Sequence, residues 1–218
     1  MSRGTLYIIS APSGAGKTSL VKELVRTTRH LTVSVSHTTR PPRCGEKEGV
    51  NYHFVTPDHF ASMVGQSSFL EHATVFEHAH GTSKIWVTEQ LNKGLDVILE
   101  IDWQGARQIR TQVPDATTIF VLPPSLATLH DRLTARGQDD EQIIAGRMEK
   151  AVSEMSHYDE FDYLVINDQF DEALFELSCI IRSRRLSAAF QHQYRRKLLT
   201  DLLSGGTAQP KNKKAGQQ

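Results

Sequence analysis

The chain has 218 residues, 39% of them apolar, so it is long enough to bury the core of one large domain or of one domain with inserted lobes. Its 25 basic and 25 acidic residues balance, which argues against a general binder of nucleic acid or of membrane surfaces, because such proteins usually carry a basic excess. No apolar stretch approaches the roughly 18 residues of a membrane span, and we expect no secretory signal. Cys44 and Cys179 lie far apart in the sequence, so we expect no disulfide framework and a cytoplasmic location.

Short apolar runs alternate with helical patterns along the chain. Runs typical of parallel strands buried on both faces cover residues 5–11, 31–36, 95–102, 117–123 and 162–168. Helical spacing of apolar residues, in two cases followed by a glycine, predicts helices over residues 17–28, 83–94 and 125–137. This alternation predicts an α/β fold with a mostly parallel sheet flanked by helices.

Two stretches interrupt the alternation. Residues 37–82 contain shorter strands and a helix that begins at Pro57 behind the cap residue Thr56, and they predict a lobe inserted after the second core strand. Residues 125–157 carry helices with three arginines and predict a second, mobile insertion. The core domain would consist of residues 1–36, 83–124 and 158–203.

The C-terminal part of the chain carries less information. From Gln169 a helical pattern runs to about Leu203. The last residues, 204–218, have little apolar surface to bury, and we expect them to be disordered. The oligomeric state is not settled by these segments, and a monomer and a homo-oligomer both stay open.

A glycine-rich segment, SAPSGAGKT at residues 10–18, follows the first predicted strand and opens the first predicted helix. It matches the end of the P-loop pattern G-x-x-x-x-G-K-[ST] at Gly16, Lys17 and Thr18, whereas Ala11 replaces the first glycine. An alanine fits there if its backbone φ is negative. A strand before the pattern and a helix after it are the context in which it binds phosphate, so the segment predicts a nucleoside triphosphate site.

The parts of this segment would act together on the triphosphate. Gly14 and Gly16 let backbone N–H groups converge on phosphate oxygens, and the N-terminus of the helix favours negative charge. Lys17 would reach the β- and γ-phosphates, and the hydroxyl of Thr18 would hold Mg²⁺. The residues expected around the triphosphate are Ala11, Pro12, Ser13, Gly14, Ala15, Gly16, Lys17 and Thr18.

Two arginines in the inserted lobe, Arg40 and Arg43, are separated only by two prolines. The prolines hold the backbone extended or turned, so both guanidinium groups can be aimed with little loss of entropy. Together with the phenol of Tyr52 they would make a pocket for one phosphate group. On these residues alone an alternative stays open, in which the arginines are solvated and pair with Glu46 and Glu48.

With these motifs the sequence resembles the guanylate kinases, from about Gly4 to at least Arg185. The resemblance rests on the segment SAPSGAGKT and on the blocks SVSHTTRPPRCGEKEGVNYHF, FLEHATVF, HGTSK, EIDWQGA and VINDQFDEAL. Guanylate kinases transfer the γ-phosphate of ATP to GMP, giving ADP and GDP. The resemblance implies a P-loop kinase fold, ATP with Mg²⁺ as donor, GMP and dGMP as acceptors, a GMP-binding lobe at residues 37–82 and a helical lid at residues 125–157.

The resemblance also implies a GMP site in which two arginines and a tyrosine bind the phosphate, a glutamate supports the arginines, and three side chains read the base. In that order these are Arg40, Arg43 and Tyr52, then Glu46, then Ser36, Glu71 and Thr82. Guanine offers two adjacent donors, N1–H and the 2-amino group, which one carboxylate can accept together. Adenine presents an acceptor instead, and such a site rejects the wrong base by on the order of 10⁴-fold.

Two positions of the implied GMP site, His80 and Glu100, depart from the family's pattern. His80 stands where a tyrosine usually donates to the GMP phosphate, and an imidazole N–H could replace it, more strongly when protonated. We hypothesise that GMP affinity rises as the pH falls toward ~6. Glu100 replaces the usual aspartate, and Glu100 and Asp102 face the same side of a strand, toward the ligand crevice. One or both would assist Mg²⁺ or GMP, unless one caps the following helix.

Positive charge is implied in the lid as well. Arg132, Arg136 and Arg147 match arginines that close over ATP, unless they pair with nearby carboxylates in solvent. Asn167 and Asp168 match the family's loop on the adenine side of ATP. Phosphoryl transfer asks mainly for positioning and charge neutralisation. The residues implied in catalysis are Lys17, Arg43, Arg136 and Arg147.

Two other functions stay open beside the kinase. A guanylate-kinase-like module can keep the fold and bind phosphopeptides without catalysis, but such modules typically lose the P-loop lysine and the lid arginines. A P-loop kinase could also act on another phosphorylated acceptor, which the residues expected to read guanine argue against.

Overall fold

The computed structural model describes residues 3–75, 77–135 and 141–204. The chain divides into two compact units, one up to Cys179 and one from Ile180 on. All strands of the described residues belong to the first unit. Apart from Ser204, the tail predicted to be disordered lies outside the described residues.

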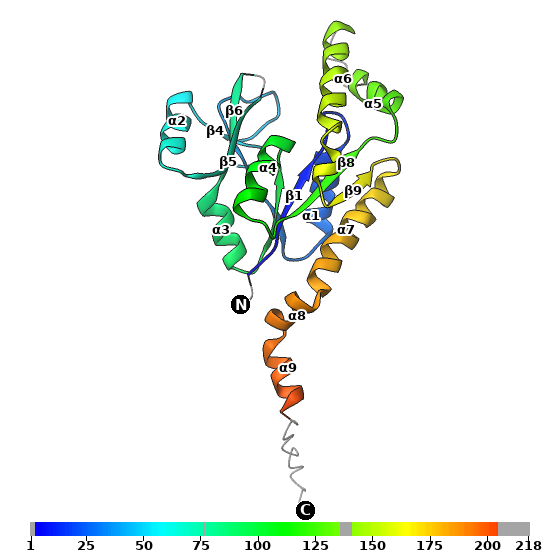
Figure 1. Cartoon of the computed structure of the whole chain (residues 1–218). Helices are drawn as coiled ribbons and strands as arrows, with labels where there is room; N and C mark the ends of the chain where they lie inside the picture. Colours follow the sequence, from blue (N-terminus) through cyan, green and yellow to red (C-terminus); the bar gives the residue numbers. More distant parts are fainter. Residues whose placement is uncertain (1–2, 76, 136–140, 205–218) are drawn as a thin grey trace, which may run out of the picture. The chain divides into compact units, whose positions relative to one another are not determined.

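A five-stranded sheet forms the centre of the first unit (Figure 1). Its strands are β1 (Leu6–Ser10), β2 (Leu31–Val33), β7 (Asp96–Glu100), β8 (Thr117–Leu122) and β9 (Tyr163–Ile166). They lie in the order β2-β7-β1-β8-β9, and every neighbouring pair is parallel. The predicted α/β fold with a mostly parallel sheet is confirmed, and each core strand falls within its predicted range.

Helices connect the strands of this sheet, and one more follows its last strand. They are α1 (Lys17–Thr27), α3 (Lys84–Asn92), α4 (Trp103–Gln112), α5 (Leu126–Thr134), α6 (Glu141–Met155), the short 3-10 helix η1 (Tyr158–Glu160) and α7 (Phe170–Leu186), which reaches into the second unit. Three of them begin with a side-chain cap, because Ser83, Asp102 and Ser125 accept hydrogen bonds from first-turn N–H groups of α3, α4 and α5. Such caps satisfy donors that a helix end leaves unpaired, and so fix where the helix begins.

The inserted lobe, residues 37–82, carries a sheet of its own that ends one residue later. Its strands are β3 (His37–Thr38), β4 (His53–Phe54), β5 (Phe69–Val75) and β6 (His78–Ser83), in the order β4-β3-β6-β5. Helix α2 (Pro57–Gly65) begins as predicted, since the hydroxyl of Thr56 accepts a hydrogen bond from the N–H of His59 at 3.2 Å. Strands β5 and β6 are antiparallel, in contrast to the central sheet.

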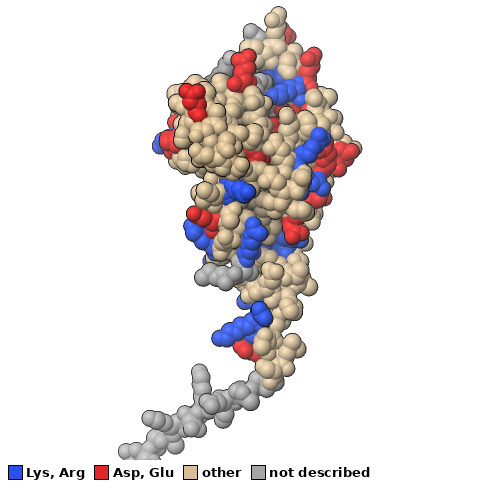
Figure 2. All heavy atoms as spheres, turned by 60° about the vertical axis from the view of Figure 1, so that its left-hand side comes forward, with Lys and Arg blue, Asp and Glu red and all other residues tan. Residues whose placement is uncertain are grey.

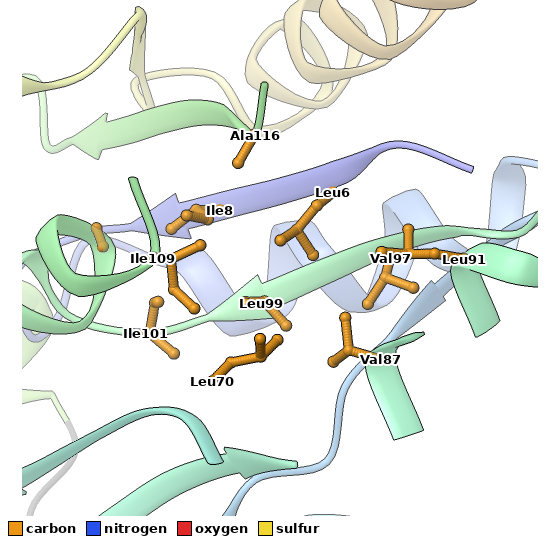
Figure 3. Packing of buried hydrophobic residues seen from close by; sticks show 11 residues of the cluster. Leu6, Ile8, Leu70, Val87, Leu91, Val97, Leu99, Ile101, Ile109 and Ala116 are labelled. Carbon is orange, nitrogen blue, oxygen red and sulfur yellow. The ribbon is translucent and has the colours of Figure 1, made fainter. Parts of the chain in front are cut away.

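The apolar core beside the lobe lies between the central sheet, α3 and α4 (Figure 3). Strands β1, β7 and β5 and the two helices contribute to it Leu6, Ile8, Val97, Leu99, Leu70, Val87, Leu91 and Ile109. Tyr7 and Ile9 alternate with the core residues of β1, face the other side of the sheet, and are fully buried as well. Burial on both faces explains why these strands appear in the sequence as continuous apolar runs.

Side chains of α4 bind the outer edge of β5. Gln108 accepts a hydrogen bond from the N–H of His72 at 3.2 Å and donates one to the carbonyl of His72 at 3.0 Å. Gln112 donates to the carbonyl of Leu70 at 2.7 Å. These three bonds flank Glu71, so they fix α4 against the part of the lobe that carries this residue.

The helical pattern from Gln169 to about Leu203 does not form one continuous helix, because it is broken at Ser187 and at Arg195. After α7 follow α8 (Ala188–Tyr194) and α9 (Arg196–Leu203). At the first interruption the hydroxyl of Ser187 accepts a hydrogen bond from the N–H of Phe190 at 3.4 Å. A serine that caps a new helix in this way competes with continuation of the preceding one.

The surface of the protein mixes charges of both signs. On the face shown in Figure 2, lysine and arginine side chains are interspersed with aspartate and glutamate side chains, in keeping with the overall balance of 25 and 25. Among the described residues, no helix combines the length and the apolar character that crossing a membrane would require.

Candidate active site

The glycine-rich segment lies between β1 and α1, as predicted. Gly14 and Gly16 have φ angles of 92° and 91°, in the left-handed region that favours glycine. Gly16 is the N-cap of α1. Because it has no side chain that could bond to the amides of the first helical turn, these amides can receive an anion. Ala11 is not among the residues with positive φ, and its side chain therefore brings no backbone strain.

Lys17 begins α1, and its side chain reaches the segment that follows β7. Its Nζ donates a hydrogen bond to the carbonyl of Ile101 at 3.4 Å. Burial lowers the pKa of Lys17, whereas the carboxylates of Glu100, Asp102 and Glu154 act to raise it. A buried ammonium group under the influence of three carboxylates is well placed to bind the oxygens of a phosphate.

Thr18 and Glu100 lie at the carboxyl end of the central sheet, where ligands of such sheets bind. The hydroxyl of Thr18 donates to Oε2 of Glu100 at 3.2 Å. The charge of Glu100 also acts on the phenol of Tyr52, whose pKa is raised mainly by burial, so Glu100 lies between the phosphate loop and the lobe. Hydroxyl and carboxylate oxygens are the donors that Mg²⁺ prefers, and the pair therefore fits the metal expected from the sequence.

Asp102 caps the next helix, the alternative that the sequence left open for one of the two carboxylates. Its Oδ1 accepts a hydrogen bond from the N–H of Gly105 at 2.9 Å. Its charge nevertheless acts on Lys17, on Glu71 and on His80. Asp102 is therefore both a helix cap and part of the electrostatics of the site.

Two side chains of α6 contact Ser13 in the phosphate loop. Arg147 donates to the hydroxyl of Ser13 at 3.0 Å, and Oε2 of Glu154 accepts from the N–H of Ser13 at 3.3 Å. Burial raises the pKa of Glu154. The predicted arginine thus does lie at the triphosphate side of the site. The carboxylate was not predicted, although the seven-residue spacing from Arg147 puts both on one face of a helix.

Asn167 joins the phosphate loop to α5. Its side-chain Nδ2 donates to the carbonyl of Ala15 at 2.7 Å, and its backbone carbonyl accepts from Nη2 of Arg132 at 3.0 Å. The Nη1 atom of Arg132 is buried and has no hydrogen-bond partner among the described residues, so it can still bind a ligand. Asp168 is exposed beside Asn167, and Arg136 lies outside the described residues.

In the lobe, Glu71 and Thr82 form the pair that the sequence assigns to base recognition. Thr82 donates its hydroxyl proton to Oε1 of Glu71 at 2.6 Å, and only 4% of the surface of Glu71 is exposed. Burial raises the pKa of this carboxyl to about 7, against the opposing effect of the Thr82 hydrogen bond. Ser36, expected at the same place, directly precedes β3, and its carbonyl accepts from the N–H of His53 at 2.9 Å.

Glu46 organises the two arginines expected to bind phosphate. Its carboxylate accepts from Nη2 of Arg40 at 2.8 and 2.9 Å and from the backbone N–H of Arg43 at 2.7 Å. The guanidinium of Arg40 also lies 5.4 Å from the ring centre of Tyr52. Glu48 accepts instead from His53 and Phe54. The alternative reading had both arginines in solvent, paired with Glu46 and Glu48. Of these two glutamates Glu46 contacts the arginines, and the contact is half-buried.

Comparison with known proteins identifies the family. A family model described as guanylate kinase matches residues 3–184. Guanylate kinases of Saccharophagus degradans and Photobacterium profundum are 58% and 55% identical to this chain, over 92% and 94% of its length and 98% and 99% of their own. The chain belongs to the guanylate kinase family. It is therefore an enzyme, a kinase, and the resemblance inferred from the sequence motifs is confirmed.

A solved structure of this family supports the assignment of the fold. The crystal structure of guanylate kinase from Anaplasma phagocytophilum matches with a TM-score of 0.72 at 29% sequence identity. The match covers 86% of this chain and 89% of that chain. The P-loop kinase fold expected from the resemblance is confirmed.

The guanylate kinase family usually has a tyrosine where this chain has His80. Nε2 of His80 lies 3.5 Å from the hydroxyl oxygen of Thr38, and its ring meets that of Tyr52 edge to face, with ring centres 5.8 Å apart. Burial lowers the pKa of His80, as do the charges of Arg40 and His78, whereas Asp102 acts to raise it. At pH 7 the imidazole is therefore mainly neutral before a ligand binds, and a bound phosphate would favour its protonation.

His80 should change the pH dependence of GMP binding relative to a tyrosine. Because the charged imidazole donates more strongly to phosphate, we expect the KM for GMP of the wild type to fall relative to that of His80→Tyr as the pH is lowered from 8 to 6. The change in the ratio is at most about tenfold per pH unit. Measuring KM for both proteins across this range checks it, and the ratio cancels every group that they share. Identical pH profiles would contradict the role given to His80.

Proposed function

We propose that this kinase transfers the γ-phosphate of ATP to GMP, and to dGMP, giving ADP and the nucleoside diphosphate. The observation that carries the proposal is the buried carboxylate of Glu71, held by Thr82 in the same lobe as the Arg40–Glu46 pair. Guanine can donate both N1–H and its 2-amino group to one carboxylate, whereas adenine would leave this buried group unpaired at a high cost in affinity.

On the ATP side, we assign the phosphates to the loop between β1 and α1 and to Lys17. Two further contacts support this assignment, since Arg147 bonds to the loop at Ser13 and Asn167 bonds to it at Ala15. Arg132 has a buried Nη1 without a partner among the described residues, which suits a donor to ATP. Arg136 keeps its proposed role in catalysis from the resemblance alone.

On the GMP side, we assign the acceptor phosphate to Arg40, Arg43, Tyr52 and His80. The carboxylate of Glu46 holds the side chain of Arg40 and the backbone of Arg43, so it reduces the entropy lost when a phosphate binds. A phosphate acceptor is already an anionic nucleophile, so no protein group has to remove a proton. The task of the cationic side chains is to align donor and acceptor and to neutralise the charge of the transferring group.

Mg²⁺ fits the same site. The hydroxyl of Thr18 and the carboxylate of Glu100 are hard oxygen donors within hydrogen-bond distance of each other, and Mg²⁺ typically takes few protein ligands beside phosphates and water. When bound with ATP, the ion would neutralise phosphate charge. Glu100 also acts electrostatically on Tyr52. It would therefore help to align the metal ion with the bound acceptor.

The same assignment gives each segment a task. Residues 37–82 would bind GMP, residues 125–157 would close over ATP, and residues 1–36, 83–124 and 158–203 would form the core. Closure has to exclude water, since ATP would otherwise be hydrolysed. Cys44 and Cys179 are both free, which suits the reducing cytoplasm proposed as the location.

The release of ADP from ATP with Mg²⁺ tests the proposal when GMP, AMP, CMP and UMP are compared as acceptors. We expect GMP to support turnover with a kcat/KM at least about 10³-fold above that of AMP, because AMP cannot pair with Glu71. If another monophosphate is preferred, the acceptor is assigned wrongly. If none stimulates the release of ADP, the site binds a phosphorylated ligand without transferring to it.

A further inference from the structure

Gly105 lies directly against the carboxylate expected to read the base. A Cβ atom added at this position would come within 2.9 Å of Oε2 of Glu71 and 3.3 Å of its Cδ. The next nearest atom is Cδ1 of Ile101, also at 3.3 Å. The Glu71 carboxylate thus occupies the space that a side chain at residue 105 would need.

The backbone gives no other reason for a glycine here. Gly105 lies in the first turn of α4 and is not among the glycines with positive φ, so an L-residue could adopt its conformation without strain. Alanine is the better helix former at such a position. The glycine therefore has its effect through the space beside Glu71.

The distance between Gly105 and Glu71 cannot easily adjust by moving the helix. Asp102 fixes the start of α4 through the N–H of Gly105. Further along the same helix, Gln108 and Gln112 bind the backbone of β5 on both sides of Glu71. Buried apolar residues of both elements pack in one core, with Leu70 and Ile109 close to Ile101 in Figure 3.

We propose that Gly105 is a specificity-determining residue of this kinase, because it leaves Oε2 of Glu71 in place to accept a second hydrogen bond from the base. The proposal rests on the assignment of GMP as the acceptor. Guanine presents two adjacent donors, so both carboxylate oxygens must lie in one orientation. Thr82 already orients Oε1, and the open space at Gly105 sets the position of Oε2.

In Gly105→Ala the atom that has to yield is the end of a flexible side chain. The carboxylate would turn or shift, the protein would stay folded, and one of the two bonds to guanine would be lost. A hydrogen bond to a charged group corresponds to about 10- to 100-fold in affinity. We therefore expect the KM for GMP to rise by this factor, with the KM for ATP unchanged.

The experiment compares GMP with inosine monophosphate, which keeps N1–H but lacks the 2-amino group. In Gly105→Ala the loss in kcat/KM should be at least about fivefold larger for GMP than for inosine monophosphate, because the proposal assigns the bond at Oε2 to the 2-amino group, which inosine monophosphate lacks. Gly65→Ala is the matched control, because a Cβ there meets nothing within 4 Å and Gly65 also lies in a helix, α2. It should change neither KM nor the melting temperature appreciably.

Three outcomes would overturn the inference. They are an unchanged KM for GMP, equal losses for GMP and inosine monophosphate, and unfolding of Gly105→Ala, since unfolding would mean that the added methyl group strikes the core and not the carboxylate. The wild type measured alongside separates these outcomes from failure of the proposed function, because in that case the wild type itself would show no turnover with GMP.

Discussion

Lys17→Ala lowers kcat for GMP phosphorylation by about 10²- to 10³-fold, the size expected when a preorganised charge-stabilising group is removed from a transferring phosphoryl group. Lys17 begins α1 behind two glycines with positive φ, and its Nζ lies near the end of β7. Burial lowers its pKa, whereas three carboxylates act to raise it. No other described side chain combines this charge with a position on the loop itself.

Steady-state kinetics of ADP release, with Lys22→Ala as the control, measure this effect. Lys22 is an exposed lysine of the same helix, so its removal changes the total charge equally without touching the site. We expect the Lys22 variant to keep kcat and both KM values. Equal losses in the two variants would mean that the charge of α1 as a whole, and not the position of Lys17, matters.

Glu71→Gln should weaken GMP by on the order of 100-fold and remove the fall in affinity toward low pH, while the opposite pH dependence expected from His80 remains. The pKa of Glu71 is raised to about 7 by burial, so its carboxyl is about half protonated at pH 7 before GMP binds. Only the ionised form accepts both guanine donors. The titration of Glu71 therefore lowers the affinity for GMP as the pH falls below 7, by at most about tenfold per unit, and opposes the effect expected from His80.

The same change has a signature in stability. Because the folded-state pKa of Glu71 lies above the 4.5 of a carboxyl in an unfolded chain, the folded state is favoured most below pH 4.5, and this contribution is lost as the pH rises through 7. A displacement from 4.5 to about 7 corresponds to about 3 kcal/mol in the free energy of unfolding. Glu71→Gln should thus be more stable than the wild type at pH 8 and not at pH 4.

Calorimetric titrations with GMP at pH 6, 7 and 8, together with denaturant unfolding at pH 4 and 8, measure both effects. Thr82→Val is a useful companion, because it removes the hydroxyl that bonds to Glu71 and leaves the carboxyl. We expect an affinity lower than that of the wild type, with the pH dependence retained. Identical pH dependences of GMP affinity in the wild type and in Glu71→Gln would contradict the titration of Glu71.

The parts of the site that the sequence predicts are those in which neighbours in space are neighbours in the chain. The phosphate loop is of this kind, since two glycines, a lysine and a threonine lie within five residues and the following helix supplies the anion site. Arg40, Arg43 and Glu46 are similar, because a short turn brings the backbone of Arg43 and the side chain of Arg40 to one carboxylate.

Contacts that join distant segments could not be predicted in the same way. Glu154 bonds to the N–H of Ser13 across 141 residues, and the spacing from Arg147 places it on the same helix face without showing that this face meets the phosphate loop. Gly105 looks like an ordinary helix glycine until β5 is placed beside α4. Asn167 was expected near ATP, and its bond to the carbonyl of Ala15 depends on β9 and β1 both lying beside β8.

The interruption of the helix at Ser187 is a different case. The serine itself is a local sign of a helix start, but the apolar spacing around it favours a continuous helix. Apolar spacing continues past Leu186, which favours one helix. A serine hydroxyl, however, can also bond to the N–H groups of a new helix, and here it accepts from that of Phe190 while it donates to the carbonyl of Arg184 in the preceding helix.

The glutamines of α4 have a consequence for how the protein behaves in a crowded solution. Strand β5 is the outermost strand of the lobe sheet, and an outermost strand presents unpaired N–H and C=O groups on which a strand of another molecule can build. Gln108 and Gln112 occupy these groups at His72 and Leu70. At these positions α4 takes the place of a further strand, and thereby protects the lobe from edge-to-edge aggregation.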